Sequence, residues 1–225
     1  MLDLPVPADR ISGVMIDRIA RTRVVPVVVV NRAEDACPLA EALLKGGLDV
    51  MEITFRTDAA EASIAHIARE FPDILLGAGT VLAAEQAIRA RDAGAVFALA
   101  PGLNPAVVNA AQDAGLVFAP GVMTPGEIER ALDLGCDLLK FFPAGAAGGV
   151  GMLKALAGPY SHTGVRFIPT GGINPENMRE YLDLPAVVAI GGSWMVDPKL
   201  IEAGDWETIT ARTQAALAGA RNVAR

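Results

Sequence analysis

Short apolar runs rich in β-branched residues alternate along the chain with stretches of helical periodicity. The first run is VVPVVVV at residues 24–30, and a helical pattern follows it from about residue 33 to residue 45. Apolar runs of this length that alternate with helices are typical of buried parallel strands and their crossover helices. The pattern therefore predicts an α/β fold.

This strand-then-helix unit recurs eight times. Asn104-Pro105 and Thr124-Pro125 each place a capping side chain before a proline at the first helical position, and Asp58 is expected to open another helix. Eight parallel strands, each backed by a helix, close into a (β/α)8 TIM barrel. The predicted strands lie within residues 24–30, 48–55, 73–80, 95–101, 115–121, 136–144, 165–173 and 186–193.

One more helix is predicted ahead of the first strand, over residues 9–21, where it would cap the bottom of the barrel. An open doubly wound sheet is the competing architecture. It usually opens with a G-x-G-x-x-G turn, which this chain lacks. No linker or shift in composition divides the chain, so we expect residues 1–225 to form a single barrel domain.

Charged residues lie within the second predicted strand. Side chains alternate along a strand, so Glu52, Thr54 and Arg56 share one face while Met51 and Ile53 share the other. The apolar face must pack against helices, which places the polar face inside the barrel. Arg56 ends this strand, where barrel enzymes gather their functional residues, and Glu52 lies deeper by about 13 Å at about 3.3 Å per residue.

A lysine lies within the sixth predicted strand, in DLLKFFPAG at residues 137–145. Lys140 shares a face with Leu138 and Phe142 and so points into the same interior. Lysine is almost never fully buried unless it is paired or used, and removal from water favours the neutral, nucleophilic amine. A Glu52–Lys140 pair that only fills the core is the alternative, but such pairs often fail to stabilise a protein. We interpret both residues as catalytic candidates.

Two Gly-Gly pairs follow the last two predicted strands, in PTGGI and IGGS. Barrels of this kind often bind phosphate between these two loops and a short extra helix, which SWMV could begin. Glycine lets backbone N–H groups approach a phosphate closely, and a hydroxyl adds a further donor. The predicted phosphate site comprises Gly171, Gly172, Gly191, Gly192 and Ser193.

Composition and charge narrow the classes of function. The chain is 52% hydrophobic and 20% charged, and its net charge of −7, without a basic cluster, argues against nucleic-acid binding. The longest apolar run is too short to cross a bilayer, and the polar start MLDLPVPADR does not resemble a signal peptide. We therefore expect a soluble cytoplasmic protein, with Cys37 and Cys136 as reduced thiols rather than a disulfide.

Metal chemistry is not expected. The two histidines lie away from the strand ends, His66 within a helix and His162 in a loop, which makes a histidine-based zinc site improbable. Asp137 precedes its strand at the bottom of the barrel, where we expect it to cap or pair. Trp194 is expected to pack and Trp206 to anchor the last helix.

Two segments carry a resemblance to a known family. GLDVMEITFR at residues 47–56 and GCDLLKFFPAGAAGG at residues 135–149 resemble the signature segments of the 2-keto-3-deoxy-6-phosphogluconate (KDPG) aldolases, a family that also includes 4-hydroxy-2-oxoglutarate (KHG) aldolase activity. The similarity continues through GAGTV, APGLNP, PTGGI and IGGSW. It implies a class I lyase of the Entner–Doudoroff type of pathway. Lys140 would form a Schiff base, Glu52 would act as acid and base, and no metal or organic cofactor would be needed.

The resemblance also implies roles for the remaining candidates. Arg56 and Thr80 are similar to the groups that hold the pyruvate carboxylate, and Pro101 and Phe142 match residues that line the pocket. The two Gly-Gly loops and Ser193 match the phosphate site. The implied ligands are a phosphorylated keto-sugar acid and pyruvate, and family members are commonly homotrimers.

Several interpretations stay open at this point. The chain departs from the family pattern at Asn31, where a basic residue is common, and in the GAA that precedes Gly148, where members are often more polar. The substrate could be the galactonate epimer or unphosphorylated 4-hydroxy-2-oxoglutarate, although EITFRT favours the gluconate type. A phosphosugar isomerase or epimerase, or a non-catalytic protein that binds a phosphate ligand, would use the same fold with Lys140 as a simple charge.

Overall fold

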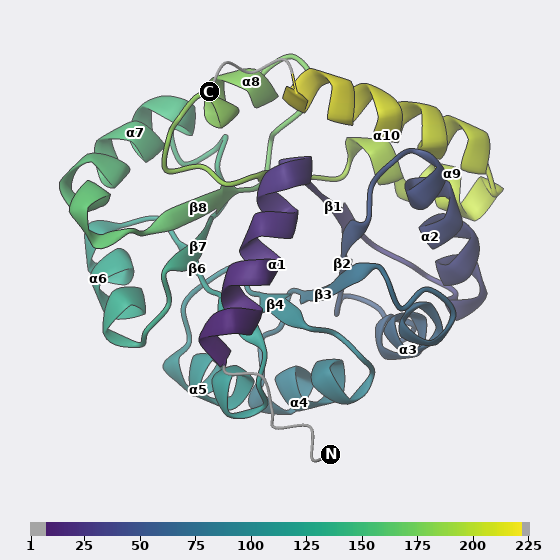
Figure 1. Ribbon diagram of the computed structural model, residues 1–225, viewed down its shortest axis with the longest axis horizontal. Coiled ribbons are helices and arrows are strands. Elements are labelled where there is room, and N and C mark those ends of the chain that lie inside the picture. Colours follow the sequence, from purple (N-terminus) through teal and green to yellow (C-terminus); the bar gives the residue numbers. More distant parts are fainter. Residues whose placement is uncertain (1–7, 222–225) are drawn as a thin grey trace.

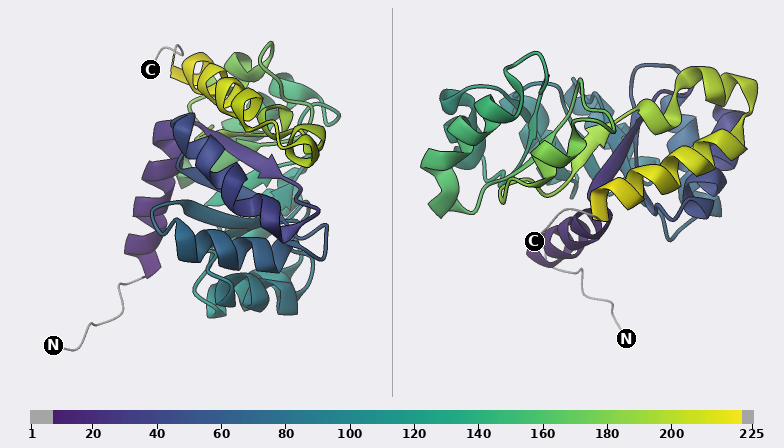
Figure 2. Two further views of the ribbon diagram at one scale, coloured as in Figure 1. Left: turned by 90° about the vertical axis from the view of Figure 1, so that its right-hand side faces the viewer. Right: turned by 90° about the horizontal axis from the view of Figure 1, so that it is seen from above.

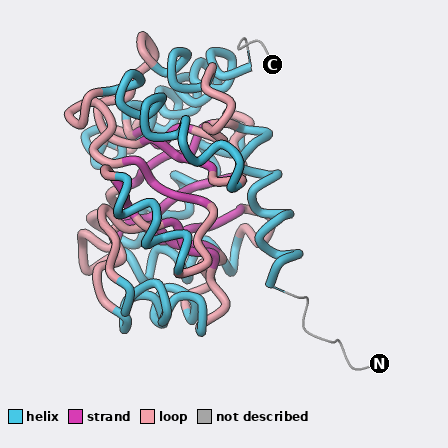
Figure 3. Tube along the Cα trace, turned by 90° about the vertical axis from the view of Figure 1, so that its left-hand side faces the viewer, coloured by secondary structure: helices cyan, strands magenta, loops and turns pink. Residues whose placement is uncertain are grey.

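Parallel strands form the centre of the molecule and helices surround them. The computed structural model describes residues 8–221, with side chains for residues 13–221. Residues 1–7 and 222–225 of the predicted domain, including most of the polar N-terminal stretch, lie outside the described residues. A ring of helices encloses the strands in Figure 1, and Figure 3 shows the strands inside a helical shell. The protein is an α/β protein with a curled parallel sheet.

The strands form two parallel sheets. One has the order β5-β4-β3-β2-β1-β9 and the other the order β6-β7-β8. The strands are β1 (Val24–Val28), β2 (Val50–Thr54), β3 (Leu75–Gly79), β4 (Phe97–Leu99), β5 (Val117–Ala119), β6 (Gly121–Val122), β7 (Leu138–Phe141), β8 (Arg166–Pro169) and β9 (Ile190–Gly192).

Helices follow the strands on the outside. They are α1 (Ala8–Thr22), α2 (Ala36–Lys45), α3 (Ala60–Glu70), α4 (Ala84–Asp92), α5 (Pro105–Asp113), α6 (Pro125–Asp133), α7 (Gly149–Tyr160), α8 (Met178–Leu182), α9 (Pro198–Ala203) and α10 (Trp206–Arg221). Short 3₁₀ helices span Ala33–Asp35, Ser161–Thr163 and Trp194–Val196.

Helix starts follow the capping signals at two of the three predicted positions. Asn104 accepts a hydrogen bond from the Ala106 N–H at the start of α5. Thr124 and Glu127 form a reciprocal capping box at the start of α6. The prediction for Asp58 is wrong, because Ala59 is the N-cap of α3. The helix begins instead with a backbone hydrogen bond from the Ala60 N–H to the Thr57 carbonyl at 3.3 Å.

The fifth predicted strand is divided in two. Pro120 separates β5 from β6 and has no N–H to donate to a neighbouring strand. Its carbonyl accepts from the Lys140 N–H at 2.9 Å, and β6 then pairs with β7. The chain thus passes from the six-stranded sheet to the three-stranded sheet at this proline.

The two sheets also meet at their other edges. Isolated parallel bridges join Phe167 to Val187 and Thr170 to Gly191, which brings the β8 segment beside the β9 segment. The Val188 N–H donates to the Phe167 carbonyl at 3.1 Å. Hydrogen bonds therefore continue between the two sheets on this side.

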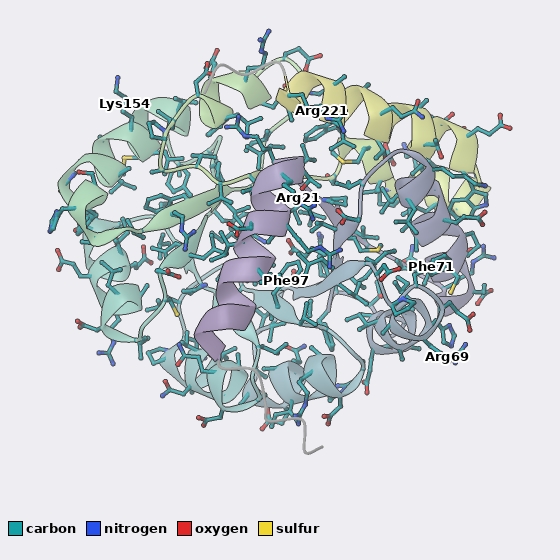
Figure 4. All side chains as sticks on the ribbon, in the orientation of Figure 1. Arg21, Arg69, Phe71, Phe97, Lys154 and Arg221 are labelled. Carbon is teal, nitrogen blue, oxygen red and sulfur yellow. The ribbon has the colours of Figure 1, made fainter. Side chains whose placement is uncertain are left out.

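The core has two parts, one on each side of the strands. Outward-facing residues such as Met51 and Phe141 pack against the surrounding helices. The inner part lies at the beginning of the strands, where Leu75 and Phe97 pack with Ile19 of α1. The predicted N-terminal helix is thus present, and it lies across this end of the strands in Figures 1 and 2, close to Phe97 in Figure 4. Apolar packing fills this end of the interior and leaves the other end for polar residues.

None of the helices within residues 8–221 combines the length and the apolar character needed to cross a bilayer.

Candidate active site

A buried ion pair lies inside the curled sheet. The Lys140 Nζ of β7 lies 3.3 Å from the Glu52 Oε1 of β2, although the two residues are 88 positions apart in the sequence. The Lys140 side chain is 5% exposed and that of Glu52 is 1% exposed. An amine and a carboxylate buried to this degree must balance each other, since an unpaired buried charge is very costly.

The predicted strand faces are confirmed for residues within the strands, but β2 ends at Thr54, so Arg56 is an exposed turn residue and does not end the strand as predicted. Glu52 and Thr54 are buried on the inner face of β2, while Met51 and Ile53 belong to the outer core. On β7, Leu138 belongs to the inner core, and the residues on either side of Lys140 belong to the outer core. Alternation of period two therefore brings the two charges together.

The surroundings hold the pair in place. Thr54 lies two residues beyond Glu52 on the same face of β2. Its hydroxyl donates to the Val28 carbonyl at 2.8 Å and links β2 to β1. The Lys140 Nζ lies 5.6 Å from the centroid of the Phe142 ring, within range of a cation–π contact. The amine is thus in contact with an aromatic face on one side and a carboxylate on another.

A cleft of about 400 Å³ opens at the carboxyl ends of the strands. It brings together residues predicted from distant parts of the sequence, and Arg56 is the one charged residue in its described lining. The lining comprises Val27, Val29, Arg56, Phe142, Thr170, Gly171, Gly172, Ile173, Gly191, Gly192, Ser193 and Pro198. Phe142 both lines this cleft and contacts the Lys140 amine, so it joins the cleft to the buried pair.

Both Gly-Gly pairs line this cleft, but only Gly171-Gly172 lies in a loop; Gly191-Gly192 is buried within β9, where it pairs with β1, and does not follow the strand as predicted. Gly171 and Gly172 have φ values of +97° and +76°, a conformation that side-chain-bearing residues rarely adopt. Gly191 is needed for space, because a Cβ there would lie 2.2 Å from the Thr170 Oγ1. The predicted short helix after the second pair is present as a 3₁₀ helix, with exposed Ser193 as its N-cap residue.

Thr80 and Pro101 lie at neighbouring strand ends, after β3 and β4, and outside the described lining of the cleft. Thr80 has a φ of +55°, which is unusual for a β-branched residue. The next residue, Val81, donates its N–H to the Leu99 carbonyl at 3.1 Å and so ties the strained turn to β4. Strain of this kind is worth about 1–3 kcal/mol and is commonly found at functional sites.

Sequence reasoning missed five residues that line the cleft, namely Val27, Val29, Thr170, Ile173 and Pro198. Val27 and Val29 alternate inward from β1, but in the apolar run VVPVVVV no polar residue indicates which face is which. Thr170 is 6% exposed and follows β8 on the same face as Ile168. The alternation rule could have identified Thr170 as facing inward, had it been applied to PTGGI.

The minor candidates lie away from the cleft. Asp137 pairs with Arg166 at 3.1 Å, as predicted for this end of the strands. His66 is half-buried in α3 and His162 is exposed. Within residues 8–221, no group of three or more histidine, cysteine or acidic residues is arranged to hold a metal ion. The Asn31 side chain donates to Glu202 of α9 at 2.8 Å.

Comparisons with known proteins place the chain among aldolases. The family model described as KDPG and KHG aldolase matches residues 15–212. The 2-dehydro-3-deoxy-phosphogluconate aldolase of Treponema pallidum is 51% identical over 201 residues, which cover 89% of this chain and 95% of the relative.

Two solved structures resemble the chain in both fold and sequence. KDPG aldolase from Legionella pneumophila, with pyruvate captured at low pH as a covalent carbinolamine intermediate, has a TM-score of 0.86 and 42% identity over 90% of this chain and 97% of that one. The 2-keto-3-deoxy-6-phosphogluconate aldolase of Zymomonas mobilis with 3-phosphoglycerate has a TM-score of 0.83 and 41% identity over 93% of this chain and 98% of that one.

The two cysteines are free and differ in their surroundings. Burial, assisted by the Asp137 carboxylate, raises the pKa of the Cys136 thiol to about 11. Burial also raises the pKa of the half-buried Cys37 thiol, with a smaller contribution from Glu70. At pH 8 only about 1 in 1,000 Cys136 thiols would be ionised, so this cysteine should be the less reactive one.

We therefore expect iodoacetamide at pH 8 to alkylate Cys37 at least about tenfold faster than Cys136, as followed by peptide mass spectrometry. Because only the thiolate reacts, the rate of Cys136 alkylation should rise about tenfold for each unit by which the pH increases, up to the pKa of the thiol. Protein unfolded in guanidinium is the control, and both cysteines should then react alike. Equal rates in the folded protein would contradict this assignment.

Proposed function

The chain belongs to the KDPG and KHG aldolase family, and from this premise we infer that it is a class I aldolase that cleaves 2-keto-3-deoxy-6-phosphogluconate to pyruvate and glyceraldehyde 3-phosphate. The buried Lys140–Glu52 pair carries the mechanistic part of this proposal. A nucleophile and a base within hydrogen-bond reach of each other are what Schiff-base catalysis requires.

Lys140 attacks the substrate. The amine must be neutral to add to the C2 ketone, and the Glu52 carboxylate 3.3 Å away is positioned to accept its proton. Addition gives a carbinolamine. Glu52 then returns the proton to the carbinolamine hydroxyl, which leaves as water, so that a protonated imine forms and the Glu52 carboxylate is restored. The related Legionella pneumophila enzyme was captured with pyruvate at the carbinolamine stage, which supports this first step here.

Glu52 then serves as base and acid. Its carboxylate takes the proton of the C4 hydroxyl, directly or through one water, and the C3–C4 bond breaks. The electron pair of that bond moves into the imine and forms an enamine, while glyceraldehyde 3-phosphate leaves. A proton returned to C3 regenerates the imine, and water then releases pyruvate and the free Lys140 amine.

The carboxylate of the substrate is assigned to Arg56 and Thr80. Arg56 is the one charged residue that residues 8–221 contribute to the cleft lining, and a guanidinium can bind a carboxylate through two parallel hydrogen bonds. Thr80, at the strained end of β3, would supply a hydroxyl. Pro101 and Phe142 would form apolar walls, and the Phe142 ring already contacts the Lys140 amine.

The phosphate is assigned to the two Gly-Gly pairs. Gly171, Gly172, Gly191 and Gly192 offer backbone that lacks side chains, and Ser193 adds an exposed hydroxyl beside them. Backbone N–H groups at a turn such as that of Gly171 and Gly172 bind phosphate well, while Gly191 and Gly192 at the end of β9 leave the cleft wall free of side chains. The N–H groups attract an anion locally even though the whole chain carries a charge of −7.

The architecture proposed with this function is a closed (β/α)8 barrel formed by residues 1–225 as one domain, with α1 capping its amino-terminal end. The continuity between β5 and β6 and the bridges between β8 and β9 support closure. The packing of Ile19 against Leu75 and Phe97 supports the cap. A crystal structure with a solvent-filled gap between β8 and β9 would contradict it.

We also propose a cytoplasmic homotrimer, because members of this family are commonly trimers and both described cysteines are free thiols. Sedimentation equilibrium should give a mass about three times the 23.4 kDa of the chain. A monomer mass at micromolar concentration would contradict the trimer, and cell fractionation tests the location.

The first test of function is trapping with pyruvate and borohydride, read by peptide mass spectrometry. The wild-type protein should gain a stable pyruvate-derived adduct on Lys140, and Lys140→Ala should lose both the adduct and turnover. Glu52→Gln should still form the adduct, but its kcat should fall by about 10²–10⁴-fold because the base is lost.

Lys154→Ala is the matched control, because Lys154 is exposed on α7, as Figure 4 shows, and its loss should change neither result. Thermal melting must accompany both active-site variants, since each leaves a buried charge without its partner. Substantial turnover by folded Lys140→Ala would exclude the Schiff-base mechanism and favour an isomerase or a binding protein.

The role of the phosphate is tested with Ser193→Ala. Loss of a hydrogen bond to a charged group costs about 1.5–3 kcal/mol, so kcat/KM for the phosphorylated substrate should fall roughly tenfold or more. Cleavage of the unphosphorylated analogue should be unchanged, as should both activities in Ser161→Ala, which alters an exposed serine of the 3₁₀ helix after α7. An equal loss with both substrates would place Ser193 outside the phosphate site.

A further inference from the structure

The inward face of β3 carries almost no side chains. Alternation places Leu75, Gly77 and Gly79 on this face, and Leu75 belongs to the inner core at the beginning of the strand. The rest of the strand therefore presents bare backbone to the interior, directly beside β2. The register pairs Glu52 with Gly77 and Thr54 with Gly79.

The Glu52 side chain fills the space above Gly79. A Cβ at Gly79 would lie 2.0 Å from Glu52 Oε1 and 2.7 Å from both the Cδ and the Cγ of Glu52. All three distances are far shorter than a van der Waals contact. Gly79 is not among the described glycines with positive φ, so its backbone conformation would suit other residues. The position needs glycine for space rather than for conformation.

The oxygen that would be displaced is the one that contacts Lys140. Glu52 Oε1 lies 3.3 Å from Lys140 Nζ and is also the atom nearest to the missing Cβ of Gly79. We propose that Gly79 is a positioning residue for the aldolase reaction, because its lack of a side chain holds the Glu52 carboxylate at the Lys140 amine. This inference rests on the proposed function and assigns no chemical step to Gly79 itself.

A methyl group at position 79 should displace the Glu52 side chain rather than the backbone of the sheet. The Glu52 carboxylate is the far end of a flexible side chain, whereas Gly79 is fixed in the ladder, where its carbonyl accepts from the Phe55 N–H at 2.8 Å. Gly79→Ala should therefore fold with Glu52 turned away. A displacement of about 1 Å at a reacting group can cost about 100-fold in rate.

Gly77 supplies a matched control on the same strand and face. A Cβ there would lie 2.2 Å from the Phe97 ring, which packs in the inner apolar core near α1 in Figure 4, and Glu52 is not among its nearest neighbours. Gly77→Ala should disturb apolar packing, while the Glu52 carboxylate keeps its place. The two substitutions thus add the same group to the same strand but displace different side chains.

The experiment compares Gly79→Ala with Gly77→Ala in three measurements: thermal melting, borohydride trapping of pyruvate on Lys140, and exchange of the pyruvate methyl hydrogens with deuterium. We expect Gly79→Ala to form the adduct but to exchange and cleave about 100-fold more slowly, as Glu52→Gln does. We expect Gly77→Ala to melt at a lower temperature with kcat within about threefold of wild type. Wild-type exchange by folded Gly79→Ala, or equal losses in both variants, would overturn the proposal.

A double-mutant cycle keeps the test independent of the reaction. Glu52→Ala removes the atoms with which the new methyl group collides, so adding Gly79→Ala to it should lower the melting temperature less than in wild type. The same reasoning predicts that Gly79→Ala causes no further loss of exchange in the Glu52→Ala protein. If Gly79→Ala alone fails to fold, recovery of folding in the double variant supports the proposal.

An equal thermal cost of Gly79→Ala in the two backgrounds would overturn the proposal, because it would mean that Gly79 and Glu52 act independently. Failure of the proposed function has a different signature, since the wild-type protein itself would then give no adduct with pyruvate. The coupling of melting temperatures between positions 52 and 79 would be measurable even in that case.

Discussion

The arrangement of the site depends on the contact between the Lys140 amine and the Glu52 carboxylate inside the curled sheet. Two charges buried among apolar side chains are tolerated only as a close pair, and such a pair is weak evidence for stability. Its geometry suits chemistry instead, because a nucleophile and a base that touch can exchange a proton before the substrate is attacked. The neighbouring strand accordingly leaves space at Gly79, and the Phe142 ring contacts the amine from another direction.

The two ends of the strands differ in what they contain. At the beginning of the strands, Phe97, Leu138 and Ile19 of α1 belong to one packed apolar core. At the carboxyl ends the lining contains four glycines and the hydroxyl groups of Thr170 and Ser193, and Arg56 is the one charged residue among its described members. Parallel strands make this division possible, since all of their carboxyl ends meet on one side of the sheet. The cation and the hydroxyl groups of the described cleft lining therefore lie at this end, although the whole chain has a net charge of −7.

Local signals in the sequence were reliable where a residue acts through its own neighbourhood. Thr124 caps its helix as expected, because the capping box joins groups only three residues apart. The alternation of β2 and β7 correctly turned Glu52 and Lys140 inward, since their apolar neighbours had to face the helices. Asp58 does not cap a helix, because α3 begins two residues later at a backbone turn. The fifth predicted strand is interrupted at Pro120, because proline has no backbone N–H to donate to the neighbouring strand.

The sequence by itself determined the α/β class, the positions of its strands and helices, and the identity of the charged residues that the strands carry inward. Only the tertiary structure decided which of those residues touch, because contact between strands 88 residues apart depends on register and curvature. It also decided that Val27 and Val29 line the cleft, which the apolar run VVPVVVV cannot indicate because it carries no polar residue. The need for glycine at position 79 arises in the same way. A backbone conformation that requires glycine can be inferred from the local sequence, but the close approach of Glu52 from another strand exists only in the folded protein.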